Sequence, residues 1–183
     1  RIDVYQRHNP RMDAIRSDEL FATLEDLVAE GKVRTYGVSL GPKIGWRDEG
    51  LAAPATRPIT SVTMIHNGLE QDPGRDLIEG AREADTGLFV RVPHSSGMLE
   101  GKYTAETTFP PSDHRSHRPR SWLLEGLQKI EALRFLTDDR RQTLGQAALK
   151  WLLAEPLVMT TLPNIYSMEQ LEEFAAAPDL PDL

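Results

Sequence analysis

Cysteine is absent from the 183-residue sequence, which excludes disulfide bonds and thiolate chemistry. Long hydrophobic runs are absent too. None approaches the ~18 residues that a membrane-spanning helix needs, and the N-terminus has no apolar region of the kind found in signal peptides. The sequence therefore predicts a cytoplasmic protein without a membrane partner.

An excess of positive charge is also missing. The sequence has 21 Lys and Arg against 28 Asp and Glu, which gives a formal net charge of −7. Such a chain repels a nucleic-acid backbone unless its basic residues gather on one face, and no basic stripe is visible. The hydrophobic content of 39% at this length is enough for one well-buried core, so we expect a single domain spanning residues 1–183.

The fingerprints of open-sheet nucleotide-binding folds do not occur: no Gly-x-Gly-x-x-Gly follows the first expected strand, and there is no Walker motif. Short β-branched runs instead alternate with stretches of helical period. Strands are expected at residues 2–5, 33–40, 59–67, 88–93 and 157–165. Helices are expected at residues 18–30, 46–53, 74–85, 122–133, 144–152 and 167–177.

This alternation is typical of parallel βα units, so the predicted fold class is α/β. The pattern alone does not choose between an open doubly wound sheet and a barrel. A complete (β/α)8 barrel usually takes about 250 residues, so five βα units would make a partial TIM barrel.

A long polar segment, residues 104–121, follows the fourth expected strand. Loops of this length usually have a function, and we expect this one to cover an exposed part of the molecule. His114 and His117 stand three apart within it, but the neighbouring arginines and the lack of helical period favour a solvated loop over a metal pair. No metal site is predicted. Trp122 and Trp151 fall on apolar helical stripes and are expected in the core.

Four segments together resemble the aldo-keto reductase family, whose members are NAD(P)H-dependent oxidoreductases built on a (β/α)8 barrel. In chain order they read DVYQRHNP, LEDLVAEGKVRTYGVSL, SSGMLEGKY and LGQAALKWLLAEPLVMTTLPNIYSMEQLEEF. They are similar in order and spacing to the family's fourth-strand Asp-x-Tyr-x-x-His, its helix-to-strand passage, its Gly-x-Leu-x-Gly-Lys-Tyr turn and its closing helix. The resemblance implies that residues 2–8 form the fourth barrel strand, so the chain would lack the first three βα units. It identifies no particular substrate.

The resemblance also implies a catalytic mechanism. In the family, a tyrosine protonates the carbonyl oxygen while the nicotinamide delivers hydride, a lysine and an aspartate tune the tyrosine, and a histidine orients the carbonyl. Only the histidine can be carried over, and His8 is the matching position. A lone histidine cannot run this reaction, because the developing alkoxide needs a tuned acid within hydrogen-bond reach.

The implied cofactor is NADP or NAD, although several positions depart from the family pattern. Leu40 follows Ser39 where the family has Asn, and Thr63 replaces a Gln. Arg91 takes the place of the aromatic residue that stacks under the nicotinamide, and its fixed charge would lie beside a ring that is itself cationic when oxidised. The cofactor-binding positions carried over are Ser39, Arg91, Ser95, Gly97, Leu99, Ser167, Gln170 and Glu173.

Near the chain's end, no basic residue matches the family's contacts to an adenosine 2′-phosphate. The corresponding positions are Asn164, Tyr166 and Gln170, so a 2′-phosphate would be poorly neutralised. Of the family's adenine-contacting Glu-Asn pair, Glu173 matches and Phe174 does not.

Two hypotheses follow. The first is an aldo-keto-reductase-type NAD(P)H-dependent oxidoreductase acting on a small-molecule carbonyl or alcohol. The second is a truncated, cofactor-independent relative that serves as a binding or accessory subunit, or that catalyses a redox-neutral reaction. Because an open five-strand piece exposes two edges and an apolar interior, we also expect a homo-oligomer or a partner that supplies the missing half-barrel.

Overall fold

The computed structural model describes residues 1–41, 45–137 and 141–183. The chain forms two compact units. The first comprises Arg1–His66, Glu70–Arg91 and Glu155–Thr161, and the second comprises Asn67–Leu69, Val92–Ala154 and Leu162–Leu183. The single-domain assignment over residues 1–183 stays a prediction.

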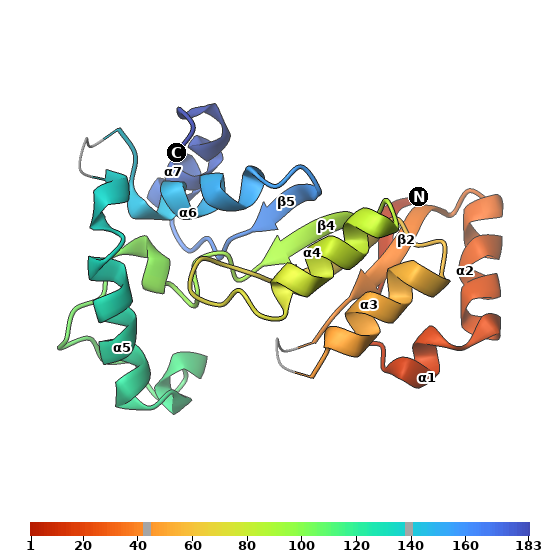
Figure 1. Ribbon diagram of the computed structural model, residues 1–183, viewed down its shortest axis with the longest axis horizontal. Helices are drawn as coiled ribbons and strands as arrows, with labels where there is room; N and C mark the ends of the chain where they lie inside the picture. Colours follow the sequence, from red (N-terminus) through yellow and green to blue (C-terminus); the bar gives the residue numbers. More distant parts are fainter. Residues whose placement is uncertain (42–44, 138–140) are drawn as a thin grey trace. The chain divides into compact units, whose positions relative to one another are not determined.

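Five strands form one sheet in chain order (Figure 1). They are β1 (Ile2–His8), β2 (Val33–Ser39), β3 (Ser61–Ile65), β4 (Gly87–Arg91) and β5 (Val158–Leu162). The strands run parallel, and each was predicted with ends that differ by no more than a few residues. Because a helix follows every strand, the predicted α/β class with five βα units is confirmed.

Seven α-helices lie in the described part of the chain. They are α1 (Met12–Ile15), α2 (Asp18–Ala29), α3 (Arg47–Thr56), α4 (Gly74–Glu83), α5 (Arg120–Glu131), α6 (Leu144–Leu153) and α7 (Met168–Ala175). Helix α1 was not predicted, because four residues are too few to show a helical period. Helix α3 continues through Pro54, beyond its predicted end.

The segment 104–121 is less irregular than predicted. A 3-10 turn spans His114–His117, and α5 already begins at Arg120. The turn forms because the Asp113 carboxylate accepts a hydrogen bond from the Arg115 N–H at 2.8 Å, which satisfies a donor at its start.

One face of the first unit's sheet is apolar. Val38, Val62 and Leu88 lie side by side in register, and each is at most 1% exposed. Helices α3 and α4 lie along the strands on this side (Figure 1). Leu40, which follows β2, is also buried and lies within reach of both helices, close to Gly50 and Leu77.

The opposite face of this sheet carries a polar layer. Gln6, Gly37 and Ser61 are register neighbours, and a Cβ at Gly37 would lie 2.1 Å from the Ser61 carbonyl oxygen. Only glycine fits there, because the backbone of the neighbouring strand approaches so closely. The Gln6 amide donates to the Ser61 hydroxyl at 3.0 Å and accepts from the Thr63 hydroxyl at 2.6 Å, so this side chain is held from both ends.

The second unit has its own core. Met98 and Leu99 of a 3-10 turn pack with Leu123 and Ile130 of α5, and a Cβ on Gly126 would collide with Met98. Trp122 packs against this cluster as expected. Trp151 was expected in the core and instead is 37% exposed. No helix in the described ranges is long and apolar enough to cross a membrane.

Candidate functional site

The strand ends of the first unit bring His8 and Ser39 together. The two residues are register partners at the carboxyl ends of β1 and β2, and the ladder continues where the Asn9 N–H donates to the Ser39 carbonyl at 2.7 Å. His8 lies two residues beyond Gln6 and therefore on the same face as the polar layer. Its side chain is exposed, and Ser39 beside it is only partly buried. Both groups are therefore accessible to a small molecule.

Arg91 ends β4 on this same face. It is the register partner of Ile65, two residues beyond the pair of Thr63 and Phe89. One guanidinium nitrogen, Nη2, donates to the Leu40 carbonyl at 3.1 Å, whereas Nε is buried without a hydrogen-bond partner among the described residues. Burial lowers the pKa of this guanidinium below its usual value. A partly desolvated cation without a carboxylate is costly, so this position favours an electron-rich or anionic contact.

The loop after β4 coils tightly through left-handed residues. Val92, Ser95, Ser96 and Gly97 all have positive φ, at 57°, 48°, 58° and 91°. The N–H groups of Gly97 and Leu99 both donate to the His94 carbonyl. A left-handed β-branched residue such as Val92 is uncommon and costs about 1–3 kcal/mol, and strain of this kind clusters at functional sites.

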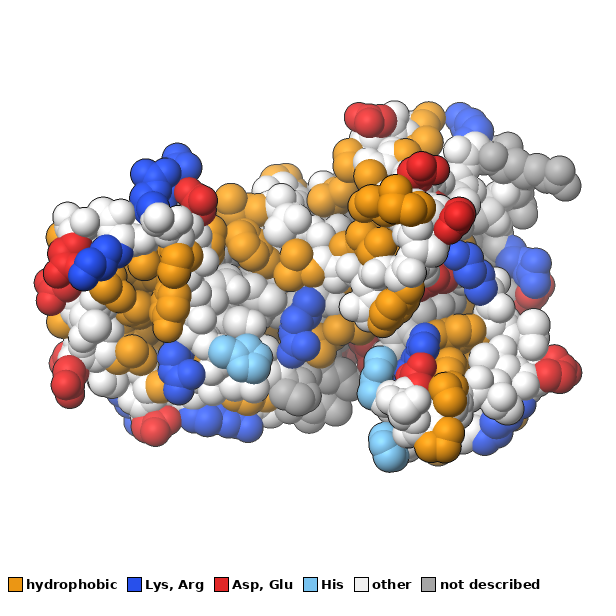
Figure 2. All heavy atoms as spheres, turned by 180° about the vertical axis from the view of Figure 1, so that it is seen from behind, with side chains coloured by type: hydrophobic (Ala, Val, Ile, Leu, Met, Phe, Trp, Pro, Cys, Tyr) orange, Lys and Arg blue, Asp and Glu red, His pale blue; other side chains and the backbone are white. Residues whose placement is uncertain are grey.

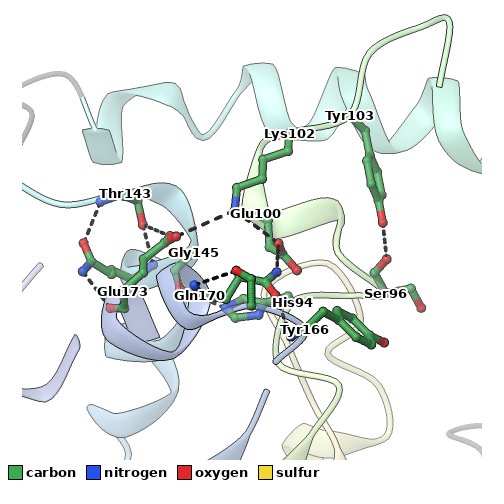
Figure 3. Close-up of polar contacts among 12 residues, drawn as sticks. His94, Ser96, Glu100, Lys102, Tyr103, Thr143, Gly145, Tyr166, Gln170 and Glu173 are labelled. Carbon is green, nitrogen blue, oxygen red and sulfur yellow. Dashed lines mark hydrogen bonds and ion pairs between the residues drawn. The ribbon is translucent and has the colours of Figure 1, made fainter. Parts of the chain in front are cut away.

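His94 is a buried polar centre of the second unit. It is 4% exposed, and its Nε2 lies 3.1 Å from the Gly145 carbonyl oxygen (Figure 3). Its ring centroid lies 4.5 Å from that of Phe174. Burial lowers the pKa of the imidazole and outweighs the hydrogen bond to Gly145, which favours the charged form. The neutral ring therefore acts as a hydrogen-bond donor to the Gly145 carbonyl.

Gln170 on α7 is tied to the loop that follows β4. Its side-chain Nε2 donates to Glu100 at 2.9 Å, and its Oε1 accepts from the Tyr166 N–H at 2.8 Å (Figure 3). Lys102 Nζ lies 3.6 Å from the same Glu100 carboxylate. The Ser167 hydroxyl caps α7 and accepts from the Gln170 N–H at 3.2 Å. Both polar atoms of the Gln170 side chain are therefore already engaged.

Glu173 is engaged in the same way. The Thr143 hydroxyl donates to its Oε1 at 2.6 Å, and Lys102 Nζ lies 3.7 Å from its Oε2. Figure 3 shows these contacts converging from α7, from the start of α6 and from the Lys102 turn. An incoming ligand would have to replace them.

Sequence reasoning found part of this arrangement. It selected His8, Ser39 and Arg91, and the structure places all three on one face of one sheet. Leu99, also selected, is 2% exposed and packs in the core of the second unit, so its side chain faces no open site.

The roles of Glu100, Lys102 and Thr143 were missed. Thr143 had a readable signal, because Thr-x-x-Gln before an apolar run is a capping-box pattern. Among the described residues, no group of three His, Asp or Glu side chains could hold a metal ion.

Five parallel strands in chain order, each followed by a helix and with polar side chains at the carboxyl ends, are the arrangement found in part of a (β/α)8 barrel. The family model for the aldo/keto reductase family matches residues 1–182, and the chain belongs to this family.

Two curated relatives illustrate the match. Aldo-keto reductase str7 of Strobilurus tenacellus is 27% identical over 187 residues, covering 98% of this chain and 54% of the relative. A probable voltage-gated potassium channel subunit beta of Arabidopsis thaliana is 27% identical over 99 residues, covering 51% of this chain and 30% of the relative. The chain spans about half the length of the curated relatives it matches first.

Solved structures support the fold. The glycerol dehydrogenase AKR11B4 from Gluconobacter oxydans superimposes with a TM-score of 0.72 at 23% identity, covering 97% of this chain and 57% of that one. The predicted partial (β/α)8 barrel is therefore confirmed.

The positions implied for the nicotinamide end of a dinucleotide suit this ligand better than the positions implied for its adenosine end. Ser39 offers a hydroxyl, and the planar Arg91 guanidinium can stack on a flat ring. Gly97, by contrast, makes room for the Tyr103 hydroxyl, which lies 2.3 Å from where a Cβ would be. Gln170 and Glu173 are held by the chain's own groups. The residues thus fit the nicotinamide end and not the adenosine end.

Proposed function

We propose that this protein is an aldo-keto-reductase-type oxidoreductase that uses NADP or NAD to interconvert a small carbonyl compound and its alcohol. One observation carries the proposal: His8 lies exposed beside Ser39 at the carboxyl ends of parallel strands, in a chain matched to the family over residues 1–182. His8 would hold the carbonyl oxygen in place, and Ser39 would hold the carboxamide of the cofactor, whose nicotinamide supplies the hydride. The acid that protonates the developing alkoxide would come from the partner half-barrel that the resemblance implies.

The first test is cofactor binding by calorimetry, with NADPH, NADH and NADP⁺. We expect saturable micromolar binding of a reduced cofactor. The oxidised form should bind more weakly, because its cationic ring would lie near the Arg91 guanidinium. Arg91→Gln should reduce the ratio of the NADP⁺ dissociation constant to the NADPH dissociation constant about fivefold. Arg7→Gln, at an exposed arginine of β1, is the charge-matched control and should leave that ratio unchanged.

The second test follows carbonyl reduction by the loss of reduced-nicotinamide absorbance, with the half-barrel that supplies the acid present. His8→Ala should lower turnover without changing the affinity for NADPH, because the imidazole would contact the carbonyl compound and not the cofactor. Failure of every nicotinamide cofactor to bind at millimolar concentration would reject the proposal.

Such a failure would favour a second function, that of a cofactor-independent accessory or binding subunit. Two observations support it. The buried Nε of Arg91 has no hydrogen-bond partner among the described residues, and the side chains of Gln170 and Glu173 are paired with groups of the chain itself. One relative, from Arabidopsis thaliana, is itself named a subunit, a probable voltage-gated potassium channel subunit beta.

A further inference from the structure

A pocket of about 210 Å³ lies within the second unit, between residues 107–109 and the start of α5. Three arginines line it, Arg115, Arg118 and Arg120, together with the aromatic rings of Phe109 and Trp122. No Asp or Glu is among the described residues that line it. The protein carries a net charge of −7, so the positive charge at this pocket is opposite in sign to that of the chain as a whole.

The three arginines differ in the groups that they contact. Arg115 is neutralised by Asp113, which it meets through two parallel hydrogen bonds, and this pairing raises the pKa of the guanidinium. Arg120 donates to the Thr107 carbonyl at 2.7 Å, and Arg118 lies over the Trp122 ring at 5.0 Å. Neither Arg118 nor Arg120 forms an ion pair with any carboxylate in the described part of the chain. The pocket therefore holds two cations without a counter-charge.

The aromatic rings give the pocket a flat apolar wall. Phe109 and Trp122 have ring centroids 6.3 Å apart with planes tilted by 52°, and Arg115 lies over Phe109 at 4.7 Å. Both rings are partly buried and keep one side toward the pocket lining. A planar guanidinium beside an aromatic face suits a ligand that has both an oxyanion and a ring.

We propose that this pocket binds a small molecule carrying a phosphate or carboxylate group on a flat ring. The oxyanion accepts hydrogen bonds from Arg118 and Arg120, and the ring packs against Phe109 and Trp122. Bringing an anion between two like charges relieves their repulsion, and arginine is suited to such oxyanions through its fork of donors. The site lies wholly in residues 107–123, and the proposal does not rest on the reductase function.

The test uses phenyl phosphate, inorganic phosphate and benzyl alcohol as probes in calorimetric titrations without nicotinamide. We expect phenyl phosphate to bind most tightly, inorganic phosphate less tightly and benzyl alcohol least, with the first two weakened by added salt. The double variant Arg118→Gln/Arg120→Gln should weaken binding of phenyl phosphate at least about tenfold. Arg118→Lys, which keeps the charge but loses the fork, should give an intermediate loss.

Arg134→Gln is the matched control, since Arg134 is an exposed arginine of the same unit that does not line the pocket. It should change the affinity less than twofold. Circular dichroism checks folding, and if the double variant unfolds, the exposed single variant Arg118→Gln decides. Unchanged binding of phenyl phosphate by the folded variant, or no binding at millimolar probe, would overturn the proposal. Loss of reductase activity alone would leave it standing.

Discussion

His94 couples the stability of the second unit to pH. Burial lowers the pKa of its imidazole below the value of about 6.5 expected in the unfolded chain. The unfolded state therefore binds more protons as pH falls, so the stability is fully present above pH ~7 and decreases as pH falls through ~6.5 toward the folded-state pKa. Burial also lowers the pKa of His66, which belongs to the first unit, so the stability of that unit should depend on pH in the same direction.

The measurement is urea unfolding between pH ~5 and pH ~8. We expect the free energy of unfolding to fall toward pH ~5, and His94→Gln to flatten part of that fall, because the amide can still donate to the Gly145 carbonyl without taking up a proton. His117→Gln, at an exposed histidine, should leave the pH profile unchanged. A pH profile that His94→Gln does not alter would contradict this assignment.

Side-chain roles could be predicted only where a local motif carried them. Short motifs placed His8 and Ser39 at strand ends, where the structure has them, and their parts in catalysis and cofactor binding stay predictions. The partners of Gln170 and Glu173 could not be predicted, because Glu100 and Thr143 lie 70 and 30 residues away along the chain. Such contacts depend on how the loop after β4 folds back, and a loop has no period to reveal it.

At the scale of elements, the start of α6 shows how a helix cap also joins two helices. The Thr143 hydroxyl accepts from the Gln146 N–H at 3.1 Å. The Gln146 side-chain oxygen in turn accepts from the Thr143 N–H, which completes a capping box. The same hydroxyl donates to Glu173 of α7, and the Gln146 amide donates to the Glu173 carbonyl at 2.8 Å. One side chain therefore stabilises both the helix start and its contact with α7.

We expect Thr143→Ala to lower the free energy of unfolding by about 2 kcal/mol, which is the upper end for an N-cap loss because the bond to Glu173 is lost as well. Thr143→Ser keeps the hydroxyl and should cost much less. Urea denaturation measures both. Equal losses in the two variants would mean that the methyl group, and not the hydroxyl, is responsible.

Strands were easier to predict than the short helical pieces. A run such as Val33–Ser39 is β-branched, aromatic and bounded by turn residues, so its type follows from composition. Helix α1 and the turn His114–His117 have only four residues each and are set by side-chain capping and packing. The segment 104–121 was read as irregular because its Pro-rich composition hides the cap that Asp113 supplies.

At the scale of the whole molecule, the apolar side chains on β1 bear on whether the protein associates with a second copy. β1 stands first in the sheet order and pairs only with β2 among the described strands. Ile2, Val4 and Tyr5 are 51%, 38% and 41% exposed. Figure 2 shows hydrophobic side chains open on one face of the molecule. An unpaired edge with exposed apolar residues is a template for pairing with another strand.

We therefore expect the protein to self-associate, with a mass-averaged sedimentation coefficient that rises with concentration and with binding of an apolar-surface dye. Val4→Lys should shift the equilibrium toward monomer, because a charge on an edge strand opposes further pairing. Thr23→Lys, on the exposed side of α2, adds the same charge away from the edge and should leave the association unchanged. A single monomeric species at every concentration, without dye binding, would show that this edge recruits no second copy.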